Sequence, residues 1–153
     1  MRISGNTIFI PGATSGIGLG LALRLHEAGN RVIVGGRRTE LLSQIADAHP
    51  GIETVRIDTA DADDVARVSA DVQRRFPDTN VLIAMAGIMR SEDLRDNDFL
   101  STAVAEVETN ILGPLRLVAA FTEFLAAQPD ATIITVSSGL AFTPMVGTPT
   151  YSA

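Results

Sequence analysis

TIFIPGATSGIG, residues 7–18, is the stretch that decides the fold, because a short apolar run gives way to glycines and then to a helical pattern. Pro11 is tolerated at the end of a strand but not in the centre of a ladder. Gly12 allows a sharp turn, while Gly16 and Gly18 have no Cβ and let the backbone approach a ligand and the sheet. The helix that follows begins with unpaired N–H groups, which favour a phosphate. The segment therefore predicts a dinucleotide-binding turn.

The spacing of these glycines narrows the choice of ligand. Gly-x3-Gly-x-Gly differs from the commoner G-x-G-x-x-G fingerprint, and it lacks the Lys-Ser/Thr ending of a nucleoside-triphosphate loop. The simplest ATPase interpretation is thereby excluded. Taken alone, the stretch also allows a purely structural role, in which the glycines serve only a tight strand-to-helix turn.

Composition sets the outer limits. A chain of 153 residues with 46% hydrophobic and 20% charged residues suits one globular domain with a sizeable core. It contains neither an apolar run of about 18 residues nor an N-terminal signal pattern, so we expect a cytoplasmic protein without a membrane partner. The absence of cysteine excludes disulfides and thiolate–metal sites, and we expect no metal centre. A net charge of −6 argues against nucleic-acid binding.

Hydrophobic periodicity predicts strands that alternate with helices along the whole chain. The expected strands are 7–11, 31–35, 52–57, 80–84 and 131–136, and the expected helices are 16–29, 39–48, 62–76 and 101–127. The strand runs are continuously apolar, as in parallel strands that helices cover on both faces. Right-handed crossovers then give an α/β, doubly wound, Rossmann-like sheet in the order 3-2-1-4-5. Its ligand site lies where the order reverses, at strands 1 and 4.

Two features modify the expected helices. The acidic run 58–64 lacks the glycine and the distal glutamate of a calcium loop, so we interpret it as cap and first-turn charge for helix 62–76. Pro114 lies inside the pattern of helix 101–127, where it removes a hydrogen bond and clashes with the preceding turn. We therefore expect a kink that leaves carbonyls near Asn110 unpaired.

The end of the second strand bears on the choice of cofactor. An NAD site places a carboxylate about 20 residues beyond the glycine turn, for the ribose 2′-hydroxyl. This chain has Gly35-Gly36-Arg37-Arg38 there. A guanidinium offers a forked, permanently charged partner to a 2′-phosphate, so the sequence favours NADP(H) over NAD(H). The alternative is that both arginines are merely solvated charges at the start of a helix.

Together with the pattern of its C-terminal half, these motifs resemble the short-chain dehydrogenase/reductase family over essentially all 153 residues. The resemblance implies cofactor contacts from the glycine motif, from an adenine-contacting pair after the third strand and from a small pair after the fourth: Gly12, Thr14, Ser15, Gly16, Ile17, Gly18, Asp58, Thr59, Ala86 and Gly87. Asn110 matches the family's helix asparagine. Ser138 and Tyr151 match the family's Ser/Tyr pair in spacing.

This resemblance implies reversible hydride transfer between nicotinamide and a small carbonyl or alcohol substrate. Tyr151 would exchange a proton with the substrate oxygen, Ser138 would hydrogen-bond the same oxygen, and Asn110 would hold a water in a proton relay. A free tyrosine ionises with a pKa of about 10, so work near neutral pH needs a positive charge beside the phenol.

Three departures from the family pattern qualify that expectation. Pro11 stands where the family usually has threonine, and the chain has Ala84-Met85 in place of two asparagines. The family lysine would fall at position 155, whereas the sequence ends at Ala153. We therefore regard residues 1–153 as a single dinucleotide-binding domain without the last family elements. The alternative to an enzyme is a noncatalytic nucleotide-binding or oligomerising fragment.

The resemblance also implies a homo-oligomer, with the helix at 101–127 contributing to the contacts. Without the later family elements, we expect this helix to expose apolar side chains, and we expect one flank of strand 131–136 to be open. The side chains expected to be exposed are Leu115, Leu117, Val118, Phe121 and Leu125.

Overall fold

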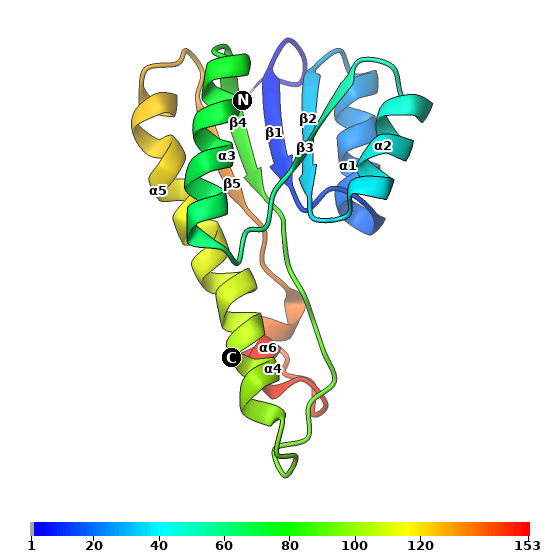
Figure 1. The fold of residues 1–153 in the computed structure, drawn as a ribbon, viewed down its shortest axis with the longest axis vertical. Coiled ribbons are helices and arrows are strands. Elements are labelled where there is room, and N and C mark those ends of the chain that lie inside the picture. The colour runs from blue at the N-terminus through cyan, green and yellow to red at the C-terminus, as the bar shows by residue number, and fades with distance from the viewer. Residues whose placement is uncertain (1) are drawn as a thin grey trace.

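A computed structural model describes residues 2–153, in which five parallel strands form one sheet with helices on both faces (Figure 1). The strand order is β3-β2-β1-β4-β5, which confirms the predicted fold class. The strands are β1 (Thr7–Pro11), β2 (Arg31–Gly36), β3 (Ile52–Arg56), β4 (Thr79–Ala84) and β5 (Thr132–Thr135). Pro11 ends β1, as expected of a residue that has no N–H to give to a ladder.

The helices bury their apolar faces against the two sides of this sheet. One core cluster joins the sheet to α1 (Gly16–Glu27) and α2 (Thr39–Ala48). The opposite cluster joins it to α3 (Ala62–Arg75) and α5 (Gly113–Ala126). Beyond the sheet, α4 (Phe99–Val107), the short 3-10 turn η2 (Gly139–Ala141) and α6 (Pro149–Ser152) form a projecting lobe (Figure 1). Within residues 2–153, no helix is long and apolar enough to cross a membrane.

The long helix predicted at 101–127 is one rod with an irregular centre. Its middle is a π-helical turn, η1 (Glu108–Leu112), in which the N–H of Gly113 donates to the carbonyl of Glu108. Pro114 is the second residue of α5, directly after the π turn, and it has no N–H to donate back into that turn. The irregularity expected from the proline therefore takes the form of a π turn directly before it, a feature often found at functional sites.

The apolar surface of this rod differs from the sequence-based expectation. Leu117, Phe121 and Leu125 are buried, because these positions, four residues apart, face the sheet and α3. Their predicted exposure was wrong, whereas Leu115 is exposed as predicted and Val118 is partly buried. Other apolar side chains exposed along the same rod are Leu100, Val104, Val107 and Ile111. On β5 at the sheet edge, Ile133 and Ile134 are more than one third exposed.

The carboxyl ends of the central strands come very close together. Met85 donates its N–H to the carbonyl of Pro11, and Gly12 donates to the carbonyl of Gly35 at 2.8 Å. Gly12 has φ +94°, and a Cβ added there would lie 2.4 Å from the backbone of Ala86. The chain after β4 can pass this point only because residue 12 is glycine.

Candidate functional site

A cleft of about 320 Å³ opens at the carboxyl ends of β1, β2, β3 and β4, and we call it the arginine cleft. Most of the predicted cofactor residues line it: Gly12, Thr14, Ser15, Arg37, Arg38, Asp58, Thr59, Ala86 and Gly87. The sequence motifs thus converge on one place in the fold. The cleft also has lining residues that the sequence did not single out as contacts: Gly36, Ile57, Met85, Ile88 and Thr109. Most of these are next to predicted residues at strand ends, and this adjacency is the sequence feature that could have indicated them.

Three residues of the glycine motif lie outside the walls of this cleft. Gly16 begins α1 with φ +57°, and Ile17 is 82% exposed. Gly18 is buried, and a Cβ there would lie 2.7 Å from the carbonyl of Gly12. These glycines therefore shape the turn. The side chain of Ser15 does not cap α1 within the described chain, so the N-terminal N–H groups of the helix stay open to an anion.

The two arginines flank the cleft in different ways. Arg38 donates from Nη2 to the Thr14 Oγ1 at 2.9 Å and to the Ser15 Oγ at 2.7 Å, so it lies directly against the glycine turn. Arg37 is about half exposed, and its Nη1 lies 4.0 Å from the Asp58 Oδ2. Two permanent positive charges thus border the same cleft.

Asp58 is held in place by a buried carboxylate behind it. The Asp64 Oδ2 accepts the N–H of Asp58 at 2.7 Å and Nη1 of Arg56 at 2.8 Å, and its Oδ1 accepts from Arg67. Burial opposes the charge on Asp64, but the Asp58 N–H and the two guanidinium groups outweigh it and hold the pKa of Asp64 below its usual value. Asp64 is therefore a charged anchor for the loop that lines the cleft.

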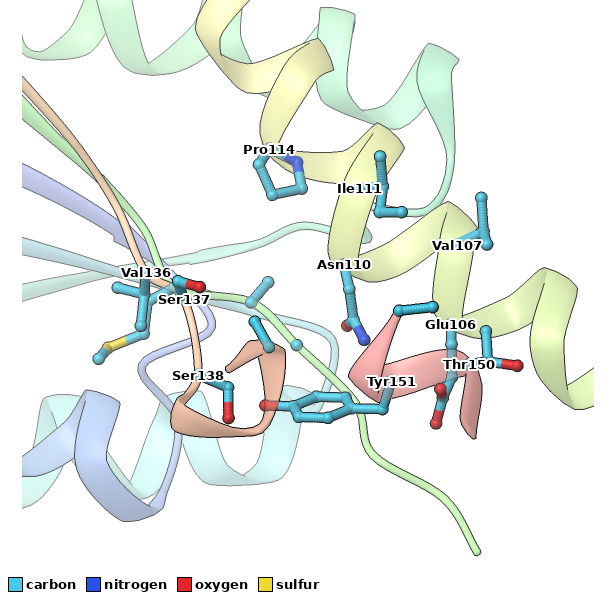
Figure 2. A pocket seen from close by; sticks show the side chains of 15 residues that line it. Glu106, Val107, Asn110, Ile111, Pro114, Val136, Ser137, Ser138, Thr150 and Tyr151 are labelled. Carbon is cyan, nitrogen blue, oxygen red and sulfur yellow. The ribbon is translucent and has the colours of Figure 1, made fainter. Parts of the chain in front are cut away.

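A second hollow, of about 270 Å³, contains the three predicted catalytic residues, and we call it the tyrosine pocket. Figure 2 shows the Tyr151 ring crossing the pocket with its hydroxyl directed toward Ser138, while Asn110 enters from the long helix. The tyrosine pocket and the arginine cleft share Met85, Ala86 and Gly87. The two hollows therefore adjoin at the end of β4.

The hydrogen bonds in this pocket show which donors and acceptors of Ser138 and Asn110 remain free to contact a substrate. The Ser138 Oγ accepts the N–H of Leu140 at 3.2 Å, which leaves its hydroxyl proton available to another acceptor. Both atoms of the Asn110 side-chain amide bond to Ile88. The Nδ2 donates to the Ile88 carbonyl at 2.7 Å, and the Oδ1 accepts the Ile88 N–H at 2.8 Å. Asn110 thus anchors the chain after β4, and its role in a water relay stays a prediction.

The sequence missed several other residues that line the tyrosine pocket. They are Glu106, Val107, Ile111, Pro114, Val136, Ser137, Ala141, Thr150 and Ala153. Glu106 stands out because it is only 1% exposed and one of its carboxylate oxygens has no hydrogen-bond partner in the described chain. Glu106 lies four residues before Asn110 in the helix, so the two side chains share a face, and this spacing is the sequence feature that could have indicated it. No group of three His, Asp or Glu side chains in residues 2–153 is arranged to hold a metal ion.

Comparison with known proteins agrees with this arrangement. A family model described as short chain dehydrogenase matches residues 6–153. The chain belongs to the short-chain dehydrogenase family. It is 38% identical over 154 residues to an uncharacterized oxidoreductase, DltE, of Bacillus subtilis (strain 168), an alignment that covers 100% of this chain and 61% of that protein. The chain thus spans about three fifths of the length of this relative.

Solved structures give the same result for the fold. A short-chain dehydrogenase from Streptomyces avermitilis matches with a TM-score of 0.88 at 27% identity, over 97% of this chain and 55% of that one. A short chain dehydrogenase from Burkholderia cenocepacia J2315, solved in complex with NADP, matches with a TM-score of 0.85 at 33% identity. That alignment covers 99% of this chain and 61% of the Burkholderia chain.

Proposed function

We propose that this protein is an NADP(H)-dependent oxidoreductase that interconverts a small carbonyl compound and the corresponding alcohol. The observation that carries the proposal is the junction of the two hollows. Asn110, Ser138 and Tyr151 line one of them, and the glycine turn and both arginines line the other. The two hollows share Met85, Ala86 and Gly87. A dinucleotide that crosses this junction would present its reactive end to Tyr151.

The residues of the arginine cleft fit such a cofactor. Gly12 lets the chain after β4 pass close to the glycine turn, because a Cβ there would meet the backbone of Ala86. The open N-terminus of α1 favours the pyrophosphate. Asp58 and Thr59 would contact the adenine end, and Ala86 and Gly87 would let the cofactor pass close to the backbone. When bound, the nicotinamide ring supplies or accepts the hydride.

The tyrosine pocket supplies the groups that handle the substrate oxygen. Tyr151 would give a proton to that oxygen in reduction and take it back in oxidation. Ser138 would donate its free hydroxyl proton to the same oxygen and so hold it in front of the phenol. Asn110 would fix the wall of the pocket through its two hydrogen bonds to Ile88. By resemblance to the family, it would also hold a water of the proton relay.

The preference for NADP(H) over NAD(H) is the finer part of the proposal. Arg37 and Arg38 both border the cleft, and a charged guanidinium hydrogen-bonds a phosphate more strongly than it bonds a hydroxyl. The Burkholderia relative was solved in complex with NADP, which supports the same choice for this chain. Asp58 lies beside Arg37, and its negative charge repels the ribose 2′-phosphate of NADP(H). The attraction of the two arginines for that phosphate would have to outweigh this repulsion.

Calorimetric titration with NADPH and NADH tests the cofactor preference. We expect Arg37→Ala and Arg38→Ala each to weaken NADPH binding by about 10- to 100-fold, the value of a charge-assisted hydrogen bond, and to change NADH binding much less. The control is Arg74→Ala, since Arg74 is an exposed residue near the end of α3. Equal losses for both cofactors would refute a 2′-phosphate site.

Turnover of NADPH with a panel of aldehydes and ketones tests the chemistry in the complete protein. We expect measurable oxidation that falls by at least about 100-fold in Tyr151→Phe, because the proton donor is lost. Ser138→Ala should also reduce kcat, with NADPH affinity unchanged. A folded protein that binds NADPH but turns over no substrate would instead indicate a noncatalytic nucleotide-binding module.

We further propose that copies of the protein associate through the long helical rod. Val104, Ile111 and Leu115 are each more than half exposed along it, and contiguous apolar surface of this kind favours contacts between chains. Sedimentation velocity should show a dimer or larger species that dissociates in Ile111→Asp. A wild-type protein that stays monomeric at micromolar concentrations would contradict this part of the proposal.

A further inference from the structure

The chain that follows β4 is attached to the long helix at two alternate residues. The N–H of Ile88 donates to the Asn110 Oδ1, and the N–H of Arg90 donates to the Glu106 Oε1 at 2.7 Å. Glu106 and Asn110 are four residues apart and therefore lie on the same side of the rod. Glu106 is almost completely buried. These two side chains fix residues 88–90 against the helix that carries Asn110.

The next alternate residue, Glu92, reaches the segment that carries Tyr151. Its N–H donates to the carbonyl of Gly147 at 2.8 Å. Its Oε2 accepts the N–H of Thr150 at 2.9 Å, across 58 positions of sequence. Glu92 therefore bonds the chain on both sides of the start of α6, next to the tyrosine.

The beginning of α6 depends on this contact because it has no local cap. Pro149 is the first residue of the helix and has no N–H, so Thr150 carries the first free donor. Within the described chain, the side chain of Thr148 does not cap the helix and lies near the Met145 carbonyl and the Ser152 hydroxyl instead. The Glu92 carboxylate supplies the missing acceptor, and its negative charge suits a helix N-terminus.

We propose that Glu92 is a positioning residue for Tyr151. It caps α6 from a distant loop, and Glu106 and Asn110 hold that loop against the long helix. The arrangement sets the phenol hydroxyl relative to Ser138 and Asn110 across the tyrosine pocket (Figure 2). The proposal rests on the function proposed above for Tyr151. Catalytic groups have to be held closely, since a displacement of about 1 Å can cost about 100-fold in rate.

The first test is structural and does not depend on turnover. Amide hydrogen exchange, followed by NMR, reports the Thr150 N–H directly. We expect Glu92→Ala to speed its exchange at least about fivefold, the equilibrium change that corresponds to the loss of one helix cap. Tyr151 is the only tyrosine and the chain has no tryptophan, so the near-UV dichroism of tyrosine reports its immobilisation. That signal should weaken in the same variant.

Three further variants separate capping from a general loss of structure. Glu92→Gln keeps an acceptor at the same reach and should restore slow exchange, whereas Glu92→Asp is too short and should behave like Glu92→Ala. Glu123→Ala removes an exposed glutamate from α5 and should resemble wild type. If Glu92→Ala does not fold, the comparison of Glu92→Asp with Glu92→Gln decides the question.

The second test is kinetic and uses the complete protein. Glu92 does not line the arginine cleft, so Glu92→Ala should lower kcat at least about fivefold and leave NADPH affinity within about twofold of wild type. Glu92→Gln should recover most of the loss. Exchange, dichroism and kcat equal to those of Glu123→Ala would overturn the proposal, as would a parallel loss of NADPH binding. If the wild type shows no carbonyl turnover, only the proposed function is refuted. The exchange of the Thr150 N–H still tests whether Glu92 caps α6.

Discussion

Replacement of Gly12 by alanine tests the close approach on which the arginine cleft depends. Gly12 adopts φ +94°, a conformation that L-residues rarely adopt. The added Cβ would lie 2.4 Å from the Cα and N of Ala86 and 2.8 Å from the carbonyl carbon of Met85. These are backbone atoms of the chain after β4, so no side-chain rotation relieves the contact.

The expected cost follows from these two effects. A residue held in a sparsely populated backbone conformation costs about 1–3 kcal/mol. Overpacking against fixed neighbours costs about 1–3 kcal/mol more. We therefore expect Gly12→Ala to lower the free energy of unfolding by about 4 kcal/mol. For a chain of this size, that corresponds to a fall in Tm of roughly 8–16 °C.

Urea denaturation followed by far-UV circular dichroism measures this change. The matched control is Gly20→Ala, because Gly20 is exposed in α1 and an added Cβ there has no described atom within 4 Å. That control should gain about 0.5–1 kcal/mol, since alanine favours a helix over glycine. NADPH binding should be lost in Gly12→Ala and kept in Gly20→Ala. A Gly12→Ala variant within about 1 kcal/mol of wild type would refute the close approach of β1 to the end of β4.

Two further predictions concern the support of the cleft and the core. Asp64→Asn should cost about 2 kcal/mol at pH 7, because it weakens charge-assisted hydrogen bonds to Asp58 and to arginine. The folded-state pKa of Asp64 lies below its unfolded value of about 3.9, so this contribution is present above about pH 4 and disappears as the pH falls toward the folded-state pKa. Urea titrations at several pH values should show the difference between wild type and variant shrinking in acid, whereas exposed Asp47→Asn should change little. Leu117→Ala should destabilise by about 2–5 kcal/mol because Leu117 is fully buried, and exposed Leu115→Ala should change stability by less than about 0.5 kcal/mol in the same denaturation assay.

The sequence alone predicted the architecture because its signals were local. Continuous apolar runs, glycine turns and helical periodicity depend on neighbouring residues, and each of the five predicted strands exists with both ends within one residue of the prediction. The parallel order followed from the handedness of crossover connections. Helix ends were predicted less well: the helix expected at 16–29 ends at Glu27, and the one expected from 101 begins at Phe99. Helix ends fray, and the residues beside them carry weak signals.

The sequence predicted the residues of the candidate site that belong to motifs, but not the residues that hold them in place through hydrogen bonds. Ser138 and Tyr151 were recognisable by spacing, and the structure places both on the tyrosine pocket. Glu92 carried no motif, and Glu106 had only its place one helical turn before Asn110, because an isolated glutamate in a sequence is most often a solvated charge. Their importance depends on backbone partners at Thr150 and Arg90, which only the fold brings within reach.

The exposed and buried faces of α5 show the same difference between what the sequence predicts and what only the tertiary structure shows. Periodicity identified an apolar helix, but it did not decide that Leu117 and Phe121 face the sheet while Leu115 faces outward. The sequence by itself determined the order of elements, the glycine turn and the types of group at the strand ends. Tertiary structure alone decided which faces are covered and which polar atoms meet. The physical reason is that local backbone preference and periodicity belong to contiguous residues, whereas burial and hydrogen bonding at this site join segments brought together by crossovers of the sheet.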